Sequence, residues 1–173
     1  LRQGDLKTAN VAALTQLRLT HRSSKLERYA LEFNTLLIRL LQGPSGQIAS
    51  LACAAAERLG FPATAVIERI RRQHQSDQAV IGGLLSSACY IEHSFPAVLY
   101  LAARYPDDIE AALIANTNAG GDNCHRGAVL GALLGAALGV AAIPERWIQG
   151  LTAYAELEAE IERFIARFGQ NDL

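Results

Sequence analysis

The chain has 173 residues, half of them hydrophobic, which suits one compact domain over residues 1–173 with a sizeable core. Its 16 basic and 17 acidic residues nearly cancel and form no long block, which argues against nucleic acid and membranes as partners. Three cysteines make no disulfide framework and no signal peptide opens the chain, so we expect a cytoplasmic protein with reduced thiols.

The first half of the chain is predicted to be helical throughout. Apolar residues recur at spacings of three and four, the pattern of a helix with one buried face. The second of these segments carries a wide apolar stripe from Leu26 to Leu41 and closes at Gly43-Pro44. The four predicted helices cover residues 5–21, 26–41, 47–59 and 63–73.

A region of small residues follows, from Gly82-Gly83 to Ser86-Ser87, and it predicts a loop close to whatever binds. The next helix is expected from Pro96 to Arg104 with Ser94 as its N-cap, because proline favours the first turn of a helix. Another helix starts at Pro106-Asp107-Asp108 and ends near residues 116–118, with acidic residues at the positive end of its dipole.

Residues 128–143 form an uninterrupted run of apolar residues and glycines. The run is shorter than the roughly 20 residues that span a membrane, so it predicts a buried core helix that ends at Ile143-Pro144. Four glycines recur at every fourth position and predict a smooth ridge against which another helix packs closely. They are Gly127, Gly131, Gly135 and Gly139.

A short helix around Trp147 and a final amphipathic helix complete the chain. The last helix places apolar residues on one side, namely Tyr154, Leu157, Ile161, Phe164, Ile165 and Phe168. No segment alternates polar and apolar residues as a strand does, so the expected fold class is all-α, a compact multi-helix orthogonal bundle.

The segment Gly120-Gly121-Asp122 stands directly before the helix of small residues. A helix start presents unpaired N–H groups that hold phosphates, and a neighbouring carboxylate can hold a cation. The segment that runs to Gly127 is therefore the expected functional centre.

Four features, in order, resemble the ADP-ribosylglycohydrolase family. Gly120-Gly121-Asp122-Asn123-Cys124-His125 is similar to its Gly-Gly-Asp-Thr-Asp-Thr signature, and Ile143-Pro144-Glu145-Arg146-Trp147 to its later Ile-Pro-x-x-Trp. Leu19-Thr20-His21 resembles its Leu-Thr-His, and Cys89 to Phe95 takes the place of a small-residue loop. The resemblance covers nearly the whole chain.

The resemblance implies a helical bundle in which two clusters of metal ions, usually Mg²⁺, organise cleavage of an N- or O-glycosidic bond to ADP-ribose. Asp122 would be a metal ligand, and Gly120 and Gly121 would bind substrate. In the family the other ligands lie in an N-terminal half, in Gly-Asp and Ser-Asp-Asp-Thr-like motifs, and we expect that half to be missing from this chain. Because the chain also has no methionine, we expect it to be a C-terminal portion that alone is inactive and needs a preceding segment or a complementary chain.

Cys124 and His125 depart from the signature, since a second aspartate and a threonine stand there in the family. Three interpretations stay open. An oxygen-ligated metal binds through Asp122; or a softer metal such as zinc or iron binds Asp122, Cys124 and His125 together; or no metal binds. In the last case His125, Arg126 and the helix start hold a pyrophosphate or satisfy the local structure.

The segment before the expected 96–104 helix holds further candidates. Tyr90 and His93 flank Glu92 where the resemblance implies substrate binding, and Tyr90 could stack on a base, although ordinary packing explains both equally well. Glu92 is the candidate catalytic acid or base, because partial withdrawal of a carboxylate from water raises its pKa.

Two functional hypotheses follow. The intact protein hydrolyses an ADP-ribosyl or similar ribosyl bond; or it is a non-catalytic relative, a binding or structural protein that has lost one metal cluster.

Overall fold

The computed structural model describes residues 6–44 and 46–168, and every regular element in that part is helical. The predicted all-α fold class is therefore confirmed. The α-helices are α1 (Leu6–Arg18), α2 (Ser24–Gln42), α3 (Ile48–Arg58), α4 (Ala63–Gln73), α5 (Asp77–Ala79), α6 (Ile91–Arg104), α7 (Ile109–Asn118), α8 (Asn123–Leu138), α9 (Glu145–Gln149) and α10 (Tyr154–Phe168). A π-helix, η1 (Val80–Leu84), and a 3₁₀-helix, η2 (Val140–Ala142), complete them.

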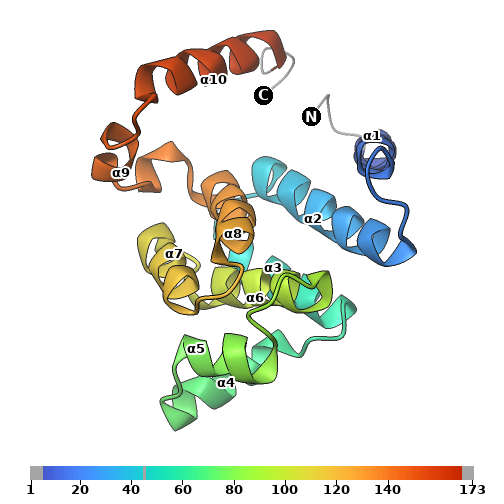
Figure 1. Cartoon of the computed structure of the whole chain (residues 1–173), viewed down its shortest axis with the longest axis vertical. Coiled ribbons are helices and arrows are strands. Elements are labelled where there is room, and N and C mark those ends of the chain that lie inside the picture. Colours follow the sequence, from blue (N-terminus) through green and yellow to red (C-terminus); the bar gives the residue numbers. More distant parts are fainter. Residues whose placement is uncertain (1–5, 45, 169–173) are drawn as a thin grey trace.

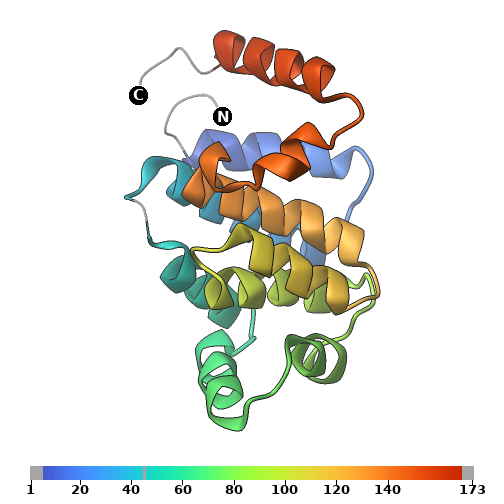
Figure 2. The same cartoon turned by 90° about the vertical axis from the view of Figure 1, so that its left-hand side faces the viewer.

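Helix α6 is the centre of the core. All residues from Phe95 to Ala103 are buried, so the helix is apolar on every side and has to be enclosed by its neighbours. Helices α2, α3, α4, α7 and α8 contact it, and Figures 1 and 2 show α3, α7 and α8 lying around it.

Side-chain caps set where two of the surrounding helices begin. Ser23 accepts a hydrogen bond from the backbone N–H of Leu26 at the start of α2. Asp108 does the same for the N–H of Ala111 at the start of α7, which confirms the predicted acidic start of that helix.

A carboxylate on α5 anchors the short α5 and η1 pair to the core. Asp77 accepts hydrogen bonds from the hydroxyls of Tyr100 and Tyr105, the second at 2.5 Å, and lies 3.3 Å from Arg104 Nε. All three donors come from the last turn of α6 or just after it. The cluster therefore fixes α5 and η1 against the C-terminal end of the central helix.

The predicted start of α6 is wrong. The helix begins at Ile91, five residues before Pro96, and its N-cap is Tyr90 rather than Ser94. The backbone N–H groups of His93 and Ser94 both bond to Tyr90 O at 2.9 Å, which closes a first turn ahead of the proline. Pro96 removes the N–H that would have bonded to Glu92, and its ring crowds the Glu92 carbonyl, a cost that burial of the following residues offsets.

The loop predicted from Gly82-Gly83 begins later than expected. Both glycines lie in the π-helix η1, and the irregular segment starts only at Leu85 and runs to Tyr90. The wide turn of a π-helix tolerates exposed glycines, which carry no side chain to pack.

Helix α8 also differs from its predicted bounds. It begins at Asn123 and ends at Leu138, because Gly139 takes a φ of +79° that ends the helix before Ile143-Pro144. The predicted glycine ridge holds only at Gly127, where a Cβ would lie 3.2 Å from Asn116 Nδ2. A Cβ at Gly131 or Gly135 would meet nothing within 4 Å, so the prediction that another helix packs closely at these positions is wrong.

The C-terminal helix lies apart from the core. Both views show α10 separated from the central helices, and its described side chains from Ala155 to Arg167 are exposed. The side chain of Phe168, predicted on its apolar side, lies outside the described part. Leu41, predicted in the buried stripe of α2, is 47% exposed, whereas the neighbouring Leu40 is buried. Among the described residues no helix has the length and hydropathy of a membrane span.

Candidate functional site

The turn between α7 and α8 is built on two consecutive glycines with left-handed backbone. Gly120 has a φ of +68° and Gly121 a φ of +64°. A Cβ on Gly121 would lie 2.1 Å from Ser87 O, so the 85–90 segment packs directly on this glycine. The N–H of Asp122 then donates to the same Ser87 carbonyl at 2.9 Å. The signature turn and the segment before α6 are thus held together through backbone.

The side chain of Arg126 stabilises this junction through hydrogen bonds. Its side chain is buried, and its guanidinium donates to Asn116 Oδ1 at 3.0 Å, to Ser87 O at 3.2 Å and to Gly120 O at 2.5 Å. Burial lowers the pKa of Arg126, whereas the nearby Asp122 carboxylate raises it. These donated hydrogen bonds stabilise the turn, and the predicted role of Arg126 in substrate binding stays a prediction.

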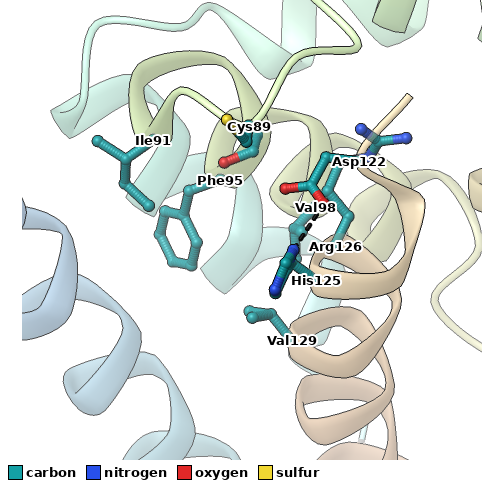
Figure 3. A pocket seen from close by; sticks show the side chains of 9 residues that line it. Cys89, Ile91, Phe95, Val98, Asp122, His125, Arg126 and Val129 are labelled. Carbon is teal, nitrogen blue, oxygen red and sulfur yellow. Dashed lines mark hydrogen bonds and ion pairs between the residues drawn. The ribbon is translucent and has the colours of Figure 1, made fainter. Parts of the chain in front are cut away.

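A pocket of about 310 Å³ opens where α8 begins (Figure 3). One wall is the face of α8 at spacings of three and four, and the other is the first turns of α6 together with Cys89, two residues before them. Phe95 and Ile91 lie across from His125 and Val129. The lining residues are Cys89, Ile91, Ser94, Phe95, Val98, Asp122, His125, Arg126 and Val129.

Asp122 and His125 form a hydrogen-bonded pair on the α8 wall. His125 Nδ1 lies 2.6 Å from Asp122 Oδ1, the dashed contact in Figure 3. The Asp122 side chain is 22% exposed and the imidazole 85% exposed. A carboxylate that holds one ring nitrogen orients the imidazole and leaves the other nitrogen, Nε2, to exchange a proton with a bound molecule.

Of the predicted site residues, the structure brings Asp122, His125 and Arg126 to the pocket, whereas Gly120 and Gly121 lie in the preceding turn and are not among the lining residues. Tyr90 is 65% exposed, and neither it nor His93 is among the lining residues. Their predicted role in substrate binding stays a prediction.

Glu92 also lies outside the pocket lining. Its carboxylate pairs with Lys25 Nζ of α2 at 3.0 Å. The pKa of Glu92 is lowered, first by a hydrogen bond from its own backbone N–H in the first turn of α6 and then by Lys25. The raised pKa expected for a catalytic acid is therefore wrong in direction.

The interpretation that places a soft metal on Asp122, Cys124 and His125 is not supported by their positions. Cys124 is exposed, and its thiol lies 3.6 Å from Asn123 Oδ1. Residues two positions apart on a helix face different sides, so the Cys124 thiol does not join Asp122 and His125. In the described part of the chain no three His, Cys, Asp or Glu side chains converge as a metal site.

Magnesium fits these residues no better. It prefers about six oxygen ligands, whereas the pocket lining includes one carboxylate, Asp122, and one of its oxygens already bonds to His125. The donor set of this pocket is that of a carboxylate and imidazole pair beside an apolar wall.

The apolar lining was not predicted from the sequence. Ile91, Ser94, Phe95 and Val98 follow the three-and-four spacing of one helix face, but the predicted start at Pro96 hid it. The apolar spacing was present in the sequence, but it indicates one helix face only if the helix begins before Pro96.

Comparison with protein-family models matches residues 1–173, the whole chain, to a family described as ADP-ribosylglycohydrolase. Searches of curated proteins and of solved structures gave no match.

Proposed function

The chain belongs to the ADP-ribosylglycohydrolase family, and from that membership we propose that its pocket forms part of a site that hydrolyses a glycosidic bond to ADP-ribose or a similar ribosyl group. The observation that carries the proposal is the Asp122 and His125 pair on the wall of a pocket built by the signature turn.

The pair suits the chemistry of such a bond. In hydrolysis, a water oxygen attacks the anomeric carbon, the bond to the leaving group breaks, and the leaving group gains a proton. His125 Nε2 is the acceptor for the proton that the water releases, and Asp122 stabilises the imidazolium that results. Asp122 also places negative charge near the positive charge that develops on the ribose.

The apolar wall fits an uncharged part of the substrate. Ile91, Phe95, Val98 and Val129 present a surface for a sugar face or a base. Arg126 is the cation in the lining, and its guanidinium donates to Asn116 and to two backbone carbonyls. We therefore place the ribose side of ADP-ribose, rather than its pyrophosphate, in this pocket.

The test compares two substitutions at the pair with the same substitutions elsewhere. We expect Asp122→Asn and His125→Asn to abolish ADP-ribose binding by calorimetry and its release from modified protein. Asp107→Asn is the matched control at an exposed aspartate. His74→Asn is the matched control at a histidine with a φ of 50°, which asparagine tolerates. The assays use the intact protein. Intact protein without substitutions that neither binds nor releases ADP-ribose, or equal losses in the controls, contradicts the proposal.

The non-catalytic alternative is favoured by a specific observation: Cys124 and His125 stand where the family resemblance implies oxygen ligands for metal. Release of ADP-ribose distinguishes the two functions, and elemental analysis adds whether an active protein depends on metal. An active metal-dependent protein contains stoichiometric metal and melts at a higher temperature in saturating Mg²⁺. A binding or structural relative shows neither change and releases no ADP-ribose.

A further inference from the structure

Helix α10 exposes an apolar stripe that the rest of the described chain does not cover. Leu157, Ile161 and Ile165 are 46%, 58% and 57% exposed, although a helix of this pattern ordinarily buries that side. Figures 1 and 2 show the helix standing away from the core. A contiguous apolar surface of this kind marks an interaction site.

Four residues on this apolar side of α10 have the spacing of a coiled-coil seam. Tyr154, Leu157, Ile161 and Phe164 are separated alternately by three and four residues, which assigns them to positions a and d of a heptad. Glu160 and Arg167 then occupy position g, and Glu158 and Ile165 occupy position e. These flanking charges decide which helix fits the seam and in which direction.

We propose that α10 pairs with α10 of a second copy of this chain in antiparallel orientation. In such a pair position g of one helix faces position g of the other. When Ile161 of one copy lies opposite Phe164 of the other, Glu160 faces Arg167 of the second copy, and symmetry repeats the ion pair. Opposed helix dipoles add to the attraction.

The same charges disfavour the alternatives. A shift of one heptad in one direction places the two Glu160 side chains together, and a shift in the other places the two Arg167 side chains together. Within the described residues, a parallel pair would set Glu160 against Ile165 and would form no ion pair between flanking positions. One antiparallel register therefore combines the apolar seam with complementary charge.

The association is expected to depend on protein concentration. Helix α10 has 15 residues, about 22 Å of length, so the seam is short. Glu160 also bonds within its own helix to Arg163 at 2.7 Å, but both side chains are about 70% exposed, and such pairs contribute little.

The experiment is sedimentation equilibrium of the full 173-residue chain over a roughly hundredfold concentration range, in which a monomer–dimer equilibrium is expected. We expect Glu160→Arg and Arg167→Glu each to weaken dimerisation by about tenfold, because like charges then face each other. The double variant restores the original dimerisation constant. Ile161→Asp abolishes the dimer while the core, which does not include this residue, keeps its melting temperature.

Two controls change charge without facing the seam. Glu156→Arg makes the same reversal as Glu160→Arg at an outward position, and Arg163→Gln removes the ion pair within α10. Both leave the dimer unchanged. A monomer at every concentration overturns the proposal, as does a dimer that survives Ile161→Asp or a double variant that does not recover. Saturation of α10 by a different polypeptide, with no self-association, overturns it as well.

Discussion

Two neighbouring glycines in the signature turn differ in what they permit. Gly120 and Gly121 have nearly the same left-handed φ, +68° and +64°. A Cβ on Gly120 would meet nothing within 4 Å, whereas one on Gly121 would collide with the carbonyl of Ser87. The backbone angle therefore restricts both positions to glycine, and the close approach of Ser87 restricts only the second.

We expect Gly121→Ala to destabilise the chain far more than Gly120→Ala. The left-handed angle alone costs about 1 kcal/mol for alanine. At Gly121 the substitution also displaces Ser87 O, which accepts from Asp122 N–H and Arg126, so a total loss of about 3 kcal/mol or more is expected. Urea unfolding measures both variants, and equal losses would show that the Ser87 contact relaxes without cost.

Arg126 shows that residue type alone does not decide what a side chain binds. An arginine next to a glycine-rich helix start is typical of a phosphate-binding site. Here the side chain is buried and its hydrogen bonds go to Asn116 and to carbonyls on both sides of the turn. The same chemistry that recognises an anion also recognises backbone carbonyl oxygens, and the sequence does not distinguish them.

At the scale of elements, the anchoring of α5 depends on protonated tyrosines. Burial and the hydrogen bond to Asp77 raise the pKa of Tyr105 from its usual 10.0 to about 12, and the pKa of Tyr100 is raised for the same reasons. Loss of either hydroxyl proton would bring a phenolate against the Asp77 carboxylate. The junction of α5 with α6 is thus sensitive to high pH.

The free energy of unfolding should fall between pH 10 and pH 12. The unfolded chain releases the Tyr105 proton near pH 10, whereas the folded chain holds it to about pH 12, so stability is full below this window and is lost across it. Thermal melts across the window test this. Tyr105→Phe should flatten the decline, and the exposed Tyr90→Phe is the matched control; an identical slope in Tyr105→Phe contradicts the assignment.

On the scale of the whole molecule, the core and the C-terminal helix are nearly independent. Buried apolar residues come from α2, α3, α4, η1, α6, α7 and α8, and none comes from the described part of α10. Because stability follows the apolar area removed from water, α10 adds little to it.

Deletion of residues 152–173 should therefore change the free energy of unfolding by less than about 1 kcal/mol at low protein concentration. Urea unfolding followed by circular dichroism measures the effect. A loss of several kcal/mol would mean that α10 packs on the core in solution.

The sequence by itself determined the all-α fold class and the family, and it located the glycine turn before α8. Helical spacing follows from where each apolar residue falls, and Gly120 to Asp122 is a local pattern, so neither depends on distant contacts. The predicted bounds of α4, residues 63 and 73, are the observed ones, since Pro62 and the polar stretch after Gln73 mark them locally.

Tertiary structure decided what local signals could not. Pro96 was placed at a helix start, yet burial of the following turns lets α6 begin at Ile91 and present Phe95 to the pocket. Whether Arg126 meets a ligand or carbonyls depends on Ser87, a residue 39 positions away. Cys124 and His125 are adjacent in sequence but only His125 joins Asp122, because the rotation of α8 sets which side chains face the pocket.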